Sequence, residues 1–197
     1  MKYLIVGLGN IGEAYAHTRH NIGFRMADAV AAALQASFTT GRYGDVAVVK
    51  YRAHQLVLLK PSTYMNLSGK AVRYWLQHEK VTVDHLLVLV DDIALPMGSL
   101  RMRAQGSAGG HNGLKDIQAM IGTDAYARIR FGVGNDFARG GQVDYVLGDW
   151  TDEEENVIGQ QLPTVVEMVK SFVDMGAERT MNAFNKHKNG NRVGQDG

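Results

Sequence analysis

The fold class is decided at the start of the chain, by the stretch Lys2-Tyr3-Leu4-Ile5-Val6-Gly7-Leu8-Gly9-Asn10-Ile11-Gly12. Residues 3–6 form a short apolar run that ends at once in a glycine-rich turn, which is typical of a buried sheet strand. Further runs of this kind, bounded by turn signals, occupy residues 46–49, 56–59, 86–90 and 129–133. The sequence therefore predicts a sheet that begins at the amino terminus.

Helical patterns separate these runs, at residues 24–34, 71–77 and 114–121. A carboxyl-terminal pair of helices follows, which we expect to be split by Pro163 and to begin with a capping box of Thr151 and Glu154. Strands interleaved with helices predict an α/β fold, and 197 residues with 45% apolar composition suit a single domain. We expect this domain, with a mixed β-sheet flanked by helices, to span residues 1–185. The polar, glycine-rich residues 186–197 are expected to be a disordered tail.

Composition excludes several kinds of site. The chain has no cysteine, which excludes disulfides, thiol nucleophiles and zinc-thiolate centres and fits a reducing compartment. The apolar run at the amino terminus is too short for a signal peptide, and no segment approaches the roughly 20 apolar residues that span a membrane. We therefore expect a cytoplasmic protein without a membrane partner.

The charge is unevenly distributed, although the formal net charge is only +1. Residues 101–130 hold five basic and two acidic side chains, whereas residues 149–155 are strongly acidic. This pattern indicates either a basic face for a polyanion or two solvated charge clusters.

Polar side chains fall where predicted strands end. Asn10 follows the first strand, Asn66 comes soon after the 56–59 strand, Asp91 ends the 86–90 strand, and Asn112 lies in a glycine-rich loop before a helix. Ligands of open α/β sheets bind outside the carboxyl ends of the strands, so these four groups are expected to converge on one rim.

The glycines of the first turn imitate a dinucleotide-binding fingerprint. Gly7-Leu8-Gly9-Asn10-Ile11-Gly12 satisfies G-x-G-x-x-G directly after a strand. An apolar helix does not follow at once, and no strand ending in Asp or Glu appears about 20 residues on. We therefore interpret the glycines as a tight turn that permits a close approach of backbone or ligand.

His20 lies in a polar loop next to the predicted rim, where Asp91 could orient its imidazole. This pair could activate a water molecule, because the chain lacks cysteine and the G-x-S-x-G motif of a nucleophilic serine. The alternative is an ordinary core or surface histidine. His17, His20 and Asp91-Asp92 could also bind a metal, but no third ligand is evident at a fixed spacing.

The three asparagines could position a substrate carbonyl or stabilise an oxyanion. For Asn66 and Asn112, each just before a helix, a cap or turn role is an equal alternative. The loop of residues 106–113 suits a phosphate or a strand of backbone, and Tyr15 and Tyr64 could stack on a terminal base or pack internally.

Several of these motifs, in this order, resemble the bacterial peptidyl-tRNA hydrolase family over about residues 1–185. The resemblance lies in Val6-Gly7-Leu8-Gly9-Asn10, in Tyr15 with Thr18-Arg19-His20-Asn21, in Lys60-Pro61-Ser62-Thr63-Tyr64-Met65-Asn66-Leu67-Ser68-Gly69, in Asp91 with Leu95-Pro96-Met97-Gly98, and in Gly109-Gly110-His111-Asn112-Gly113-Leu114.

The resemblance implies a monomeric α/β hydrolase of phosphorylase/hydrolase-like fold that cleaves peptidyl-tRNA without a metal or other cofactor. By position, His20 resembles the base that deprotonates water, Asp91 its orienting partner, and Asn10 the residue that senses the blocked amino end. The remaining matched positions imply contacts with substrate, water or the 3′ end and acceptor stem of the tRNA, namely Asn66, Asn112, Tyr15, Tyr64, Arg101, Arg103, Lys115 and Arg130.

Three positions depart from the family pattern. Ile11 replaces a usual proline, Ala94 stands where an acidic residue is common, and Asn135-Asp136 replaces a basic residue and proline. The first departure is expected to loosen the turn that carries Asn10, and the third removes positive charge from the expected tRNA side. The rival hypotheses are a nucleotide-binding module that uses the first glycines and a non-catalytic RNA-binding protein that uses the basic stretch.

Overall fold

The computed structural model describes residues 1–185, in which a seven-stranded mixed sheet forms the centre of the molecule. The order across the sheet is β2-β3-β4-β1-β5-β7-β6. Strands β1, β4, β5 and β7 run parallel, whereas β2, β3 and β6 are antiparallel to their neighbours. The strands are β1 (Lys2–Gly7), β2 (Thr39–Gly41), β3 (Gly44–Tyr51), β4 (His54–Pro61), β5 (Leu86–Asp92), β6 (Leu100–Arg103) and β7 (Ala127–Gly132).

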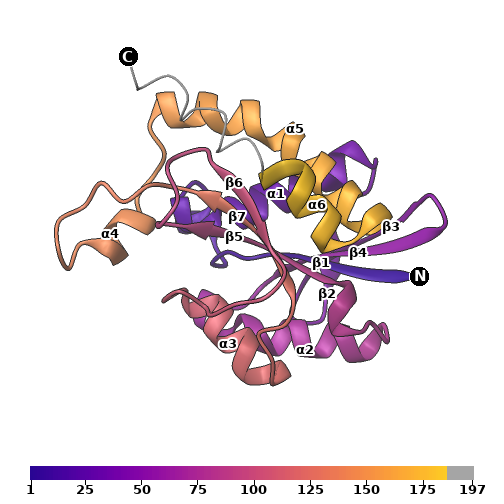
Figure 1. Cartoon of the computed structure of the whole chain (residues 1–197). Coiled ribbons are helices and arrows are strands. Elements are labelled where there is room, and N and C mark those ends of the chain that lie inside the picture. Colours follow the sequence, from indigo (N-terminus) through magenta and orange to yellow (C-terminus); the bar gives the residue numbers. More distant parts are fainter. Residues whose placement is uncertain (186–197) are drawn as a thin grey trace, which may run out of the picture.

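Helices cover both faces of this sheet (Figure 1). One face carries α1 (Ile22–Ala33), α5 (Asp152–Met175) and α6 (Ala177–Phe184), and the other carries α2 (Ser68–His78) and α3 (Asn112–Ile121). The short α4 (Gln142–Val146) stands apart from these layers. Four short 3₁₀ helices complete the description, namely η1 (Glu13–Tyr15), η2 (Arg19–Asn21), η3 (Met65–Leu67) and η4 (Val83–His85).

Two apolar cores, one on each face, follow from the alternation of side chains along the strands. In β1, Ile5 packs in the core under α1 and α5, while Leu4 and Val6 pack in the core under α2 and α3. All three are fully buried, as expected for a central strand of a sheet covered on both faces. The expected α/β fold is confirmed.

The first glycine turn serves the packing of α1. A Cβ on Gly7 would lie 2.1 Å from the carbonyl oxygen of Gly23 in α1, so the strand end and the helix meet backbone to backbone. Because α1 begins only at Ile22, after η1 and η2, the segment lacks the helix of a dinucleotide-binding unit.

The carboxyl-terminal helices differ from expectation at Pro163, which lies inside the continuous helix α5. The carbonyl that Pro163 leaves without its helical partner belongs to Gly159, on the exposed side, where water can satisfy it. The break comes instead at Gly176, with φ of +85°, and the capping box of Thr151 and Glu154 is present.

The short elements β2, β6 and α4 were not expected from the sequence. At the sheet edge, the side-chain amide of Asn185 accepts a hydrogen bond from the backbone nitrogen of Met102 in β6 and donates one to its carbonyl oxygen. The expected disorder of residues 186–197 concerns residues outside those described.

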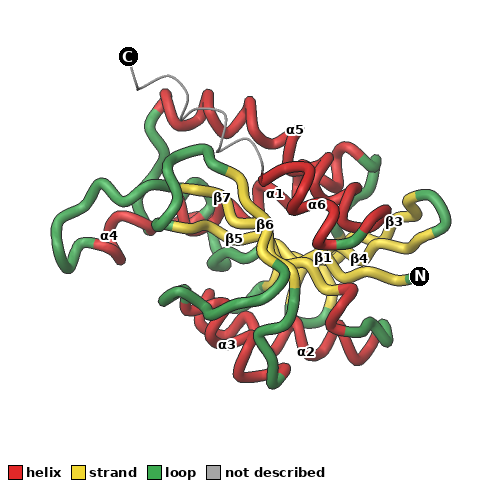
Figure 2. Tube along the Cα trace, viewed as in Figure 1, coloured by secondary structure: helices red, strands yellow, loops and turns green. Residues whose placement is uncertain are grey.

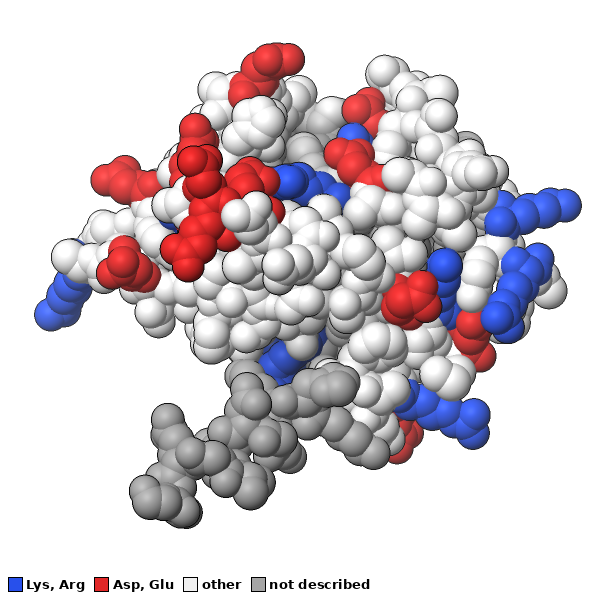
Figure 3. All heavy atoms as spheres, turned by 90° about the horizontal axis from the view of Figure 1, so that it is seen from above, with Lys and Arg blue, Asp and Glu red and all other residues white. Residues whose placement is uncertain are grey.

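Acidic side chains gather over one part of the face that Figure 3 shows, where α5 begins with Asp152, Glu153, Glu154 and Glu155. Among the residues that the structure describes, no helix combines the length and apolar character needed to cross a lipid bilayer.

We predict that Gly7→Ala lowers the free energy of unfolding by about 3 kcal/mol, because the added methyl group forces β1 and α1 apart. Denaturant unfolding measures the loss. Gly159→Ala is the matched control, since a Cβ at this exposed helical position meets nothing within 4 Å and should stabilise by up to about 1 kcal/mol. Equal stability of the two variants would contradict the close approach.

Candidate active site

A cleft of about 540 Å³ opens at the carboxyl ends of the parallel strands, as the sheet topology predicts. Its walls come from the loops that follow β1, β4 and β5, from β6 and β7, from the start of α3 and from α4. Nine of the expected site residues line it, namely Asn10, Tyr15, His20, Tyr64, Asn66, Asp91, Arg103, Asn112 and Arg130. Arg101 and Lys115 do not line it.

His20 and Asp91 form the expected pair. The Nδ1 atom of His20 lies 2.8 Å from Oδ2 of Asp91, and within residues 1–185 Nε2 has no hydrogen-bond partner on a side chain that is 14% exposed. Burial lowers the pKa of His20, but the charge and hydrogen bond of Asp91 outweigh it and raise the pKa above 6.5. The neutral ring, with its proton on Nδ1, therefore presents a strengthened base to the cleft.

His111 was missed as a site residue and makes the second contact of the same carboxylate. Its Nδ1 atom accepts hydrogen bonds from the backbone nitrogens of Gly113 and Leu114 and so caps α3. The ring proton must then be on Nε2, which lies 2.8 Å from Oδ1 of Asp91. Histidine is not a preferred helix cap, so its position before α3 gave little signal.

Asp91 is 4% exposed and accepts a hydrogen bond at each oxygen. Burial alone would raise its pKa, but the two imidazoles keep the pKa of Asp91 well below its usual range. The carboxylate therefore stays ionised and fixes the orientation of both rings.

Asn10 is held by three hydrogen bonds. The amide of Asn21 pairs with the backbone nitrogen and oxygen of Asn10, at 2.8 and 2.9 Å, so the turn is secured although Ile11 follows it. The Oδ1 atom of Asn10 accepts from the backbone nitrogen of Met65 at 2.8 Å. Its amide NH₂ group makes no hydrogen bond within residues 1–185 and is the part available to the cleft.

Asn66 and Asn112 do not cap helices. Asn66 lies within η3, whose start has no side-chain cap, and α3 is capped by His111. Both side chains are exposed and line the cleft, which favours a ligand role. Tyr15 and Tyr64 also line it, and Tyr64 is 56% exposed, unlike an internal packing residue.

The basic wall of the cleft comprises Arg103, Arg128 and Arg130, which lie on adjacent antiparallel strands with Arg103 directly opposite Arg128. Arg130 is paired with Asp92 at 2.9 Å. The fully buried Arg128 was not expected in the site. Its guanidinium donates to the carbonyl oxygens of Gly106, Asp124 and Tyr126, and so ties down the base of the glycine loop.

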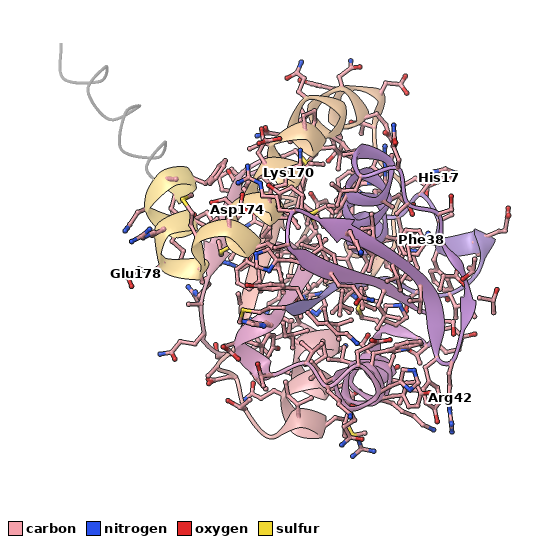
Figure 4. The ribbon with its side chains drawn as sticks, turned by 90° about the vertical axis from the view of Figure 1, so that its right-hand side faces the viewer. His17, Phe38, Arg42, Lys170, Asp174 and Glu178 are labelled. Carbon is pink, nitrogen blue, oxygen red and sulfur yellow. The ribbon has the colours of Figure 1, made fainter. Side chains whose placement is uncertain are left out.

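The histidines and aspartate that could hold a metal are His20, Asp91 and His111, with ligand atoms within 4.8 Å of one another. The alternative built on His17 is wrong, because this exposed side chain lies at the periphery (Figure 4) and outside the group. Among the other departures, Ala94 is in the cleft wall, and Asn135 and Asp136 are exposed beyond β7.

Comparison with known proteins gives a consistent result. A family model described as peptidyl-tRNA hydrolase matches residues 4–192. The peptidyl-tRNA hydrolase of Phocaeicola vulgatus is 56% identical over 94% of this chain and 100% of that protein. That of Porphyromonas gingivalis is 54% identical over the same shares. The crystal structure of the Acinetobacter baumannii peptidyl-tRNA hydrolase superposes with a TM-score of 0.88 at 31% identity, covering 93% of this chain and 94% of that one.

We predict that Asp91→Asn lowers the pKa of His20 below 6.5, because the burial that depresses it then acts without the opposing carboxylate. An NMR titration of the His20 ring measures this shift. Asp92→Asn, which alters the partner of Arg130, should leave the pKa of His20 unchanged. An unchanged value in Asp91→Asn would show that another group sets the charge of this ring.

Proposed function

This chain belongs to the peptidyl-tRNA hydrolase family, and we propose that it hydrolyses the ester bond between peptide and tRNA in N-blocked peptidyl-tRNA, with His20 as the general base. The observation that carries the mechanism is the free Nε2 atom of His20, in a ring fixed through Nδ1 by a buried carboxylate. Translation rescue, the release of tRNA from prematurely released peptidyl-tRNA, is the corresponding role.

The reaction begins with a water molecule next to Nε2 of His20. As the water oxygen attacks the ester carbonyl carbon, its proton passes to Nε2, and Asp91 stabilises the imidazolium that forms. Collapse of the tetrahedral intermediate breaks the bond to the ribose oxygen, which takes the proton from His20. The products are free tRNA and the peptide carboxylic acid, which releases its proton to solvent to give the carboxylate.

Asn66 and Asn112 supply neutral amide groups to the cleft on the sides of η3 and α3. An amide N–H can stabilise the negative charge that develops on the carbonyl oxygen, and an amide oxygen can hold the attacking water. We assign to Asn66 and Asn112 together the stabilisation of the carbonyl oxygen and the binding of the attacking water.

The hydrogen-bond pattern favours chemistry without a metal. Both oxygens of Asp91 accept ring protons, and the lone pair on Nδ1 of His111 is used by the cap of α3. A metal bound among these groups would have to displace the protons and break the cap. Of the two imidazoles, only that of His20 keeps a nitrogen, Nε2, without a hydrogen bond within residues 1–185, and one such nitrogen beside a carboxylate falls short of the three protein ligands usual for catalytic zinc.

The free NH₂ group of Asn10 supports discrimination for a blocked amino end. An amide hydrogen donor can pair with the carbonyl oxygen of an acylated amine, but it offers nothing to an ammonium, which also donates. Placing an unpaired ammonium against this group costs several kcal/mol, so aminoacyl-tRNA is disfavoured.

The tRNA moiety is proposed to lie along the basic wall, with Arg103 and Arg130 toward backbone phosphates of the acceptor stem. Arg101 and Lys115 stay in this proposal as contacts outside the cleft. Tyr15 and Tyr64 provide ring faces for the terminal bases at the 3′ end. We propose that the enzyme acts as a monomer in the cytoplasm, where translation supplies the substrate.

We predict that His20→Ala lowers kcat by about 10² to 10⁴, while Asp91→Asn costs less because it removes only orientation and charge. Release of N-acetyl amino acid from N-acetyl-aminoacyl-tRNA measures both.

In the native enzyme the rate should rise with pH through the pKa of His20, above 6.5, as the neutral base appears. Retention of tRNA without release would favour a non-catalytic binder, and loss of activity to a chelator that zinc alone restores would favour a metal.

We predict that Asn10→Asp narrows the preference for N-blocked substrate, because the carboxylate keeps an acceptor for Met65 and presents a charge that pairs with an ammonium. Asn10→Ala, the control, should mainly lower kcat/KM on blocked substrate. The measurement is kcat/KM for matched N-acetyl and free aminoacyl-tRNA. If both variants keep the native ratio, discrimination resides elsewhere in the cleft.

A further inference from the structure

Helix α4 forms one wall of the cleft and is anchored at its far end by Tyr145, whose hydroxyl donates to the carbonyl oxygen of Val133. Gln142, Val143 and Val146, with the following Leu147, line the cleft. The helix is reached from β7 through a long loop and projects away from the two helical layers (Figure 2). Its main neighbour among the other described helices and strands is η2, the 3₁₀ helix that contains His20.

Arg19, the residue before His20, joins η2 to the end of α4 through several contacts. Its Nη1 atom donates to the carbonyl oxygen of Tyr145 at 3.1 Å, and its guanidinium lies over the Tyr145 ring, 4.3 Å from the centroid. The backbone nitrogen of Arg19 donates to the carbonyl oxygen of Gly148. One residue thus contacts the carboxyl-terminal end of α4 through both its backbone and its side chain.

The other end of the guanidinium is anchored to the start of α5. Nη2 of Arg19 donates to Oε1 of Glu154 at 2.9 Å, and the same oxygen accepts from the backbone nitrogen of Thr151 in the capping box. The side chains of Arg19 and Glu154 are only 12% and 16% exposed, so solvent screens this pair less than a surface ion pair. The position of the wall is therefore set by a rigid helix end.

We propose that Arg19 is a positioning residue that holds the α4 wall against the His20 segment and thereby supports substrate binding, while the chemical step runs without it. The proposal rests on the hydrolase function given above. Within residues 1–185, Arg19 makes no hydrogen bond to the His20 ring. Asp91 orients that ring instead. Loss of Arg19 should therefore loosen the wall and leave the base intact.

Arginine suits this place for a geometric reason. A planar guanidinium can stack on an aromatic ring while its two ends donate to different acceptors, here Tyr145 and Glu154. A lysine keeps the charge but provides one point of contact. Arg19→Lys should therefore retain part of the effect, and Arg19→Met should remove it.

Arg25→Met provides the matched control. Arg25 makes an ion pair of the same kind, at 2.8 Å, with Glu155, the residue after Glu154, and it lies on α1 outside the cleft. Its removal deletes an arginine–glutamate pair at the same end of α5 without touching α4. General destabilisation of α5 would therefore show in both methionine variants.

The experiment combines kinetics with limited trypsin digestion at Arg139, an exposed residue in the loop before α4. For Arg19→Met we expect KM for N-acetyl-aminoacyl-tRNA to rise about tenfold with kcat within about threefold of native, and Arg19→Lys to show about a threefold rise. Cleavage at Arg139 should accelerate in the order native, Arg19→Lys, Arg19→Met. Arg25→Met should match the native enzyme in both measurements.

Two results would overturn the proposal: a fall in kcat with unchanged KM, or cleavage at Arg139 no faster in Arg19→Met than in Arg25→Met. If Arg19→Met does not fold, the same comparisons are made on Arg19→Lys. Digestion does not depend on activity, so a native chain that fails to release N-acetyl amino acid would defeat the proposed function while the wall could still be judged.

Discussion

The buried carboxylate of Asp91 is the group on which the organisation of the site depends. Its two oxygens fix two imidazoles that come from opposite sides, one from η2 and one from the loop that opens α3. A buried charge persists only where it is paired and hydrogen-bonded, and here the pairing needs β5, η2 and α3 in their places. The geometry of the His20 imidazole is therefore a property of the whole sheet edge rather than of a local loop.

The two histidines have different tasks although each contacts the same carboxylate. His20 keeps one nitrogen free, whereas both nitrogens of His111 are occupied, one by the helix start and one by Asp91. Nδ1 of His111 accepts from two backbone nitrogens at the start of α3. The arrangement thus separates a ring that presents Nε2 to the cleft from a ring that is held at both nitrogens.

Pattern and strand topology were sufficient to predict the α/β fold and the convergence of Asn10, Asn66, Asp91 and Asn112 on one rim. These predictions succeeded because a central strand is apolar on both faces. A polar residue that follows such a parallel strand must lie at the carboxyl edge of the sheet. What they missed depends on contacts distant in sequence. Arginine is usually exposed, and Arg128 is buried because its guanidinium donates to three carbonyl oxygens of neighbouring segments. A proline inside a helical pattern normally predicts the end of the helix. At Pro163 the unpaired carbonyl, that of Gly159, can bond to water, so α5 continues.

The two margins of the sheet are covered to different extents, and this bears on the tendency of the protein to self-associate. An open strand edge is a template on which another chain can add a strand. At the β6 margin, Asn185 uses one side-chain amide to occupy both backbone groups of Met102, as a neighbouring peptide unit would. At the other margin, the three residues of β2 pair only with residues 44–46 of the eight-residue β3. Asn185 therefore occupies backbone groups of β6 to which an added strand would bond, a function in assembly rather than in catalysis.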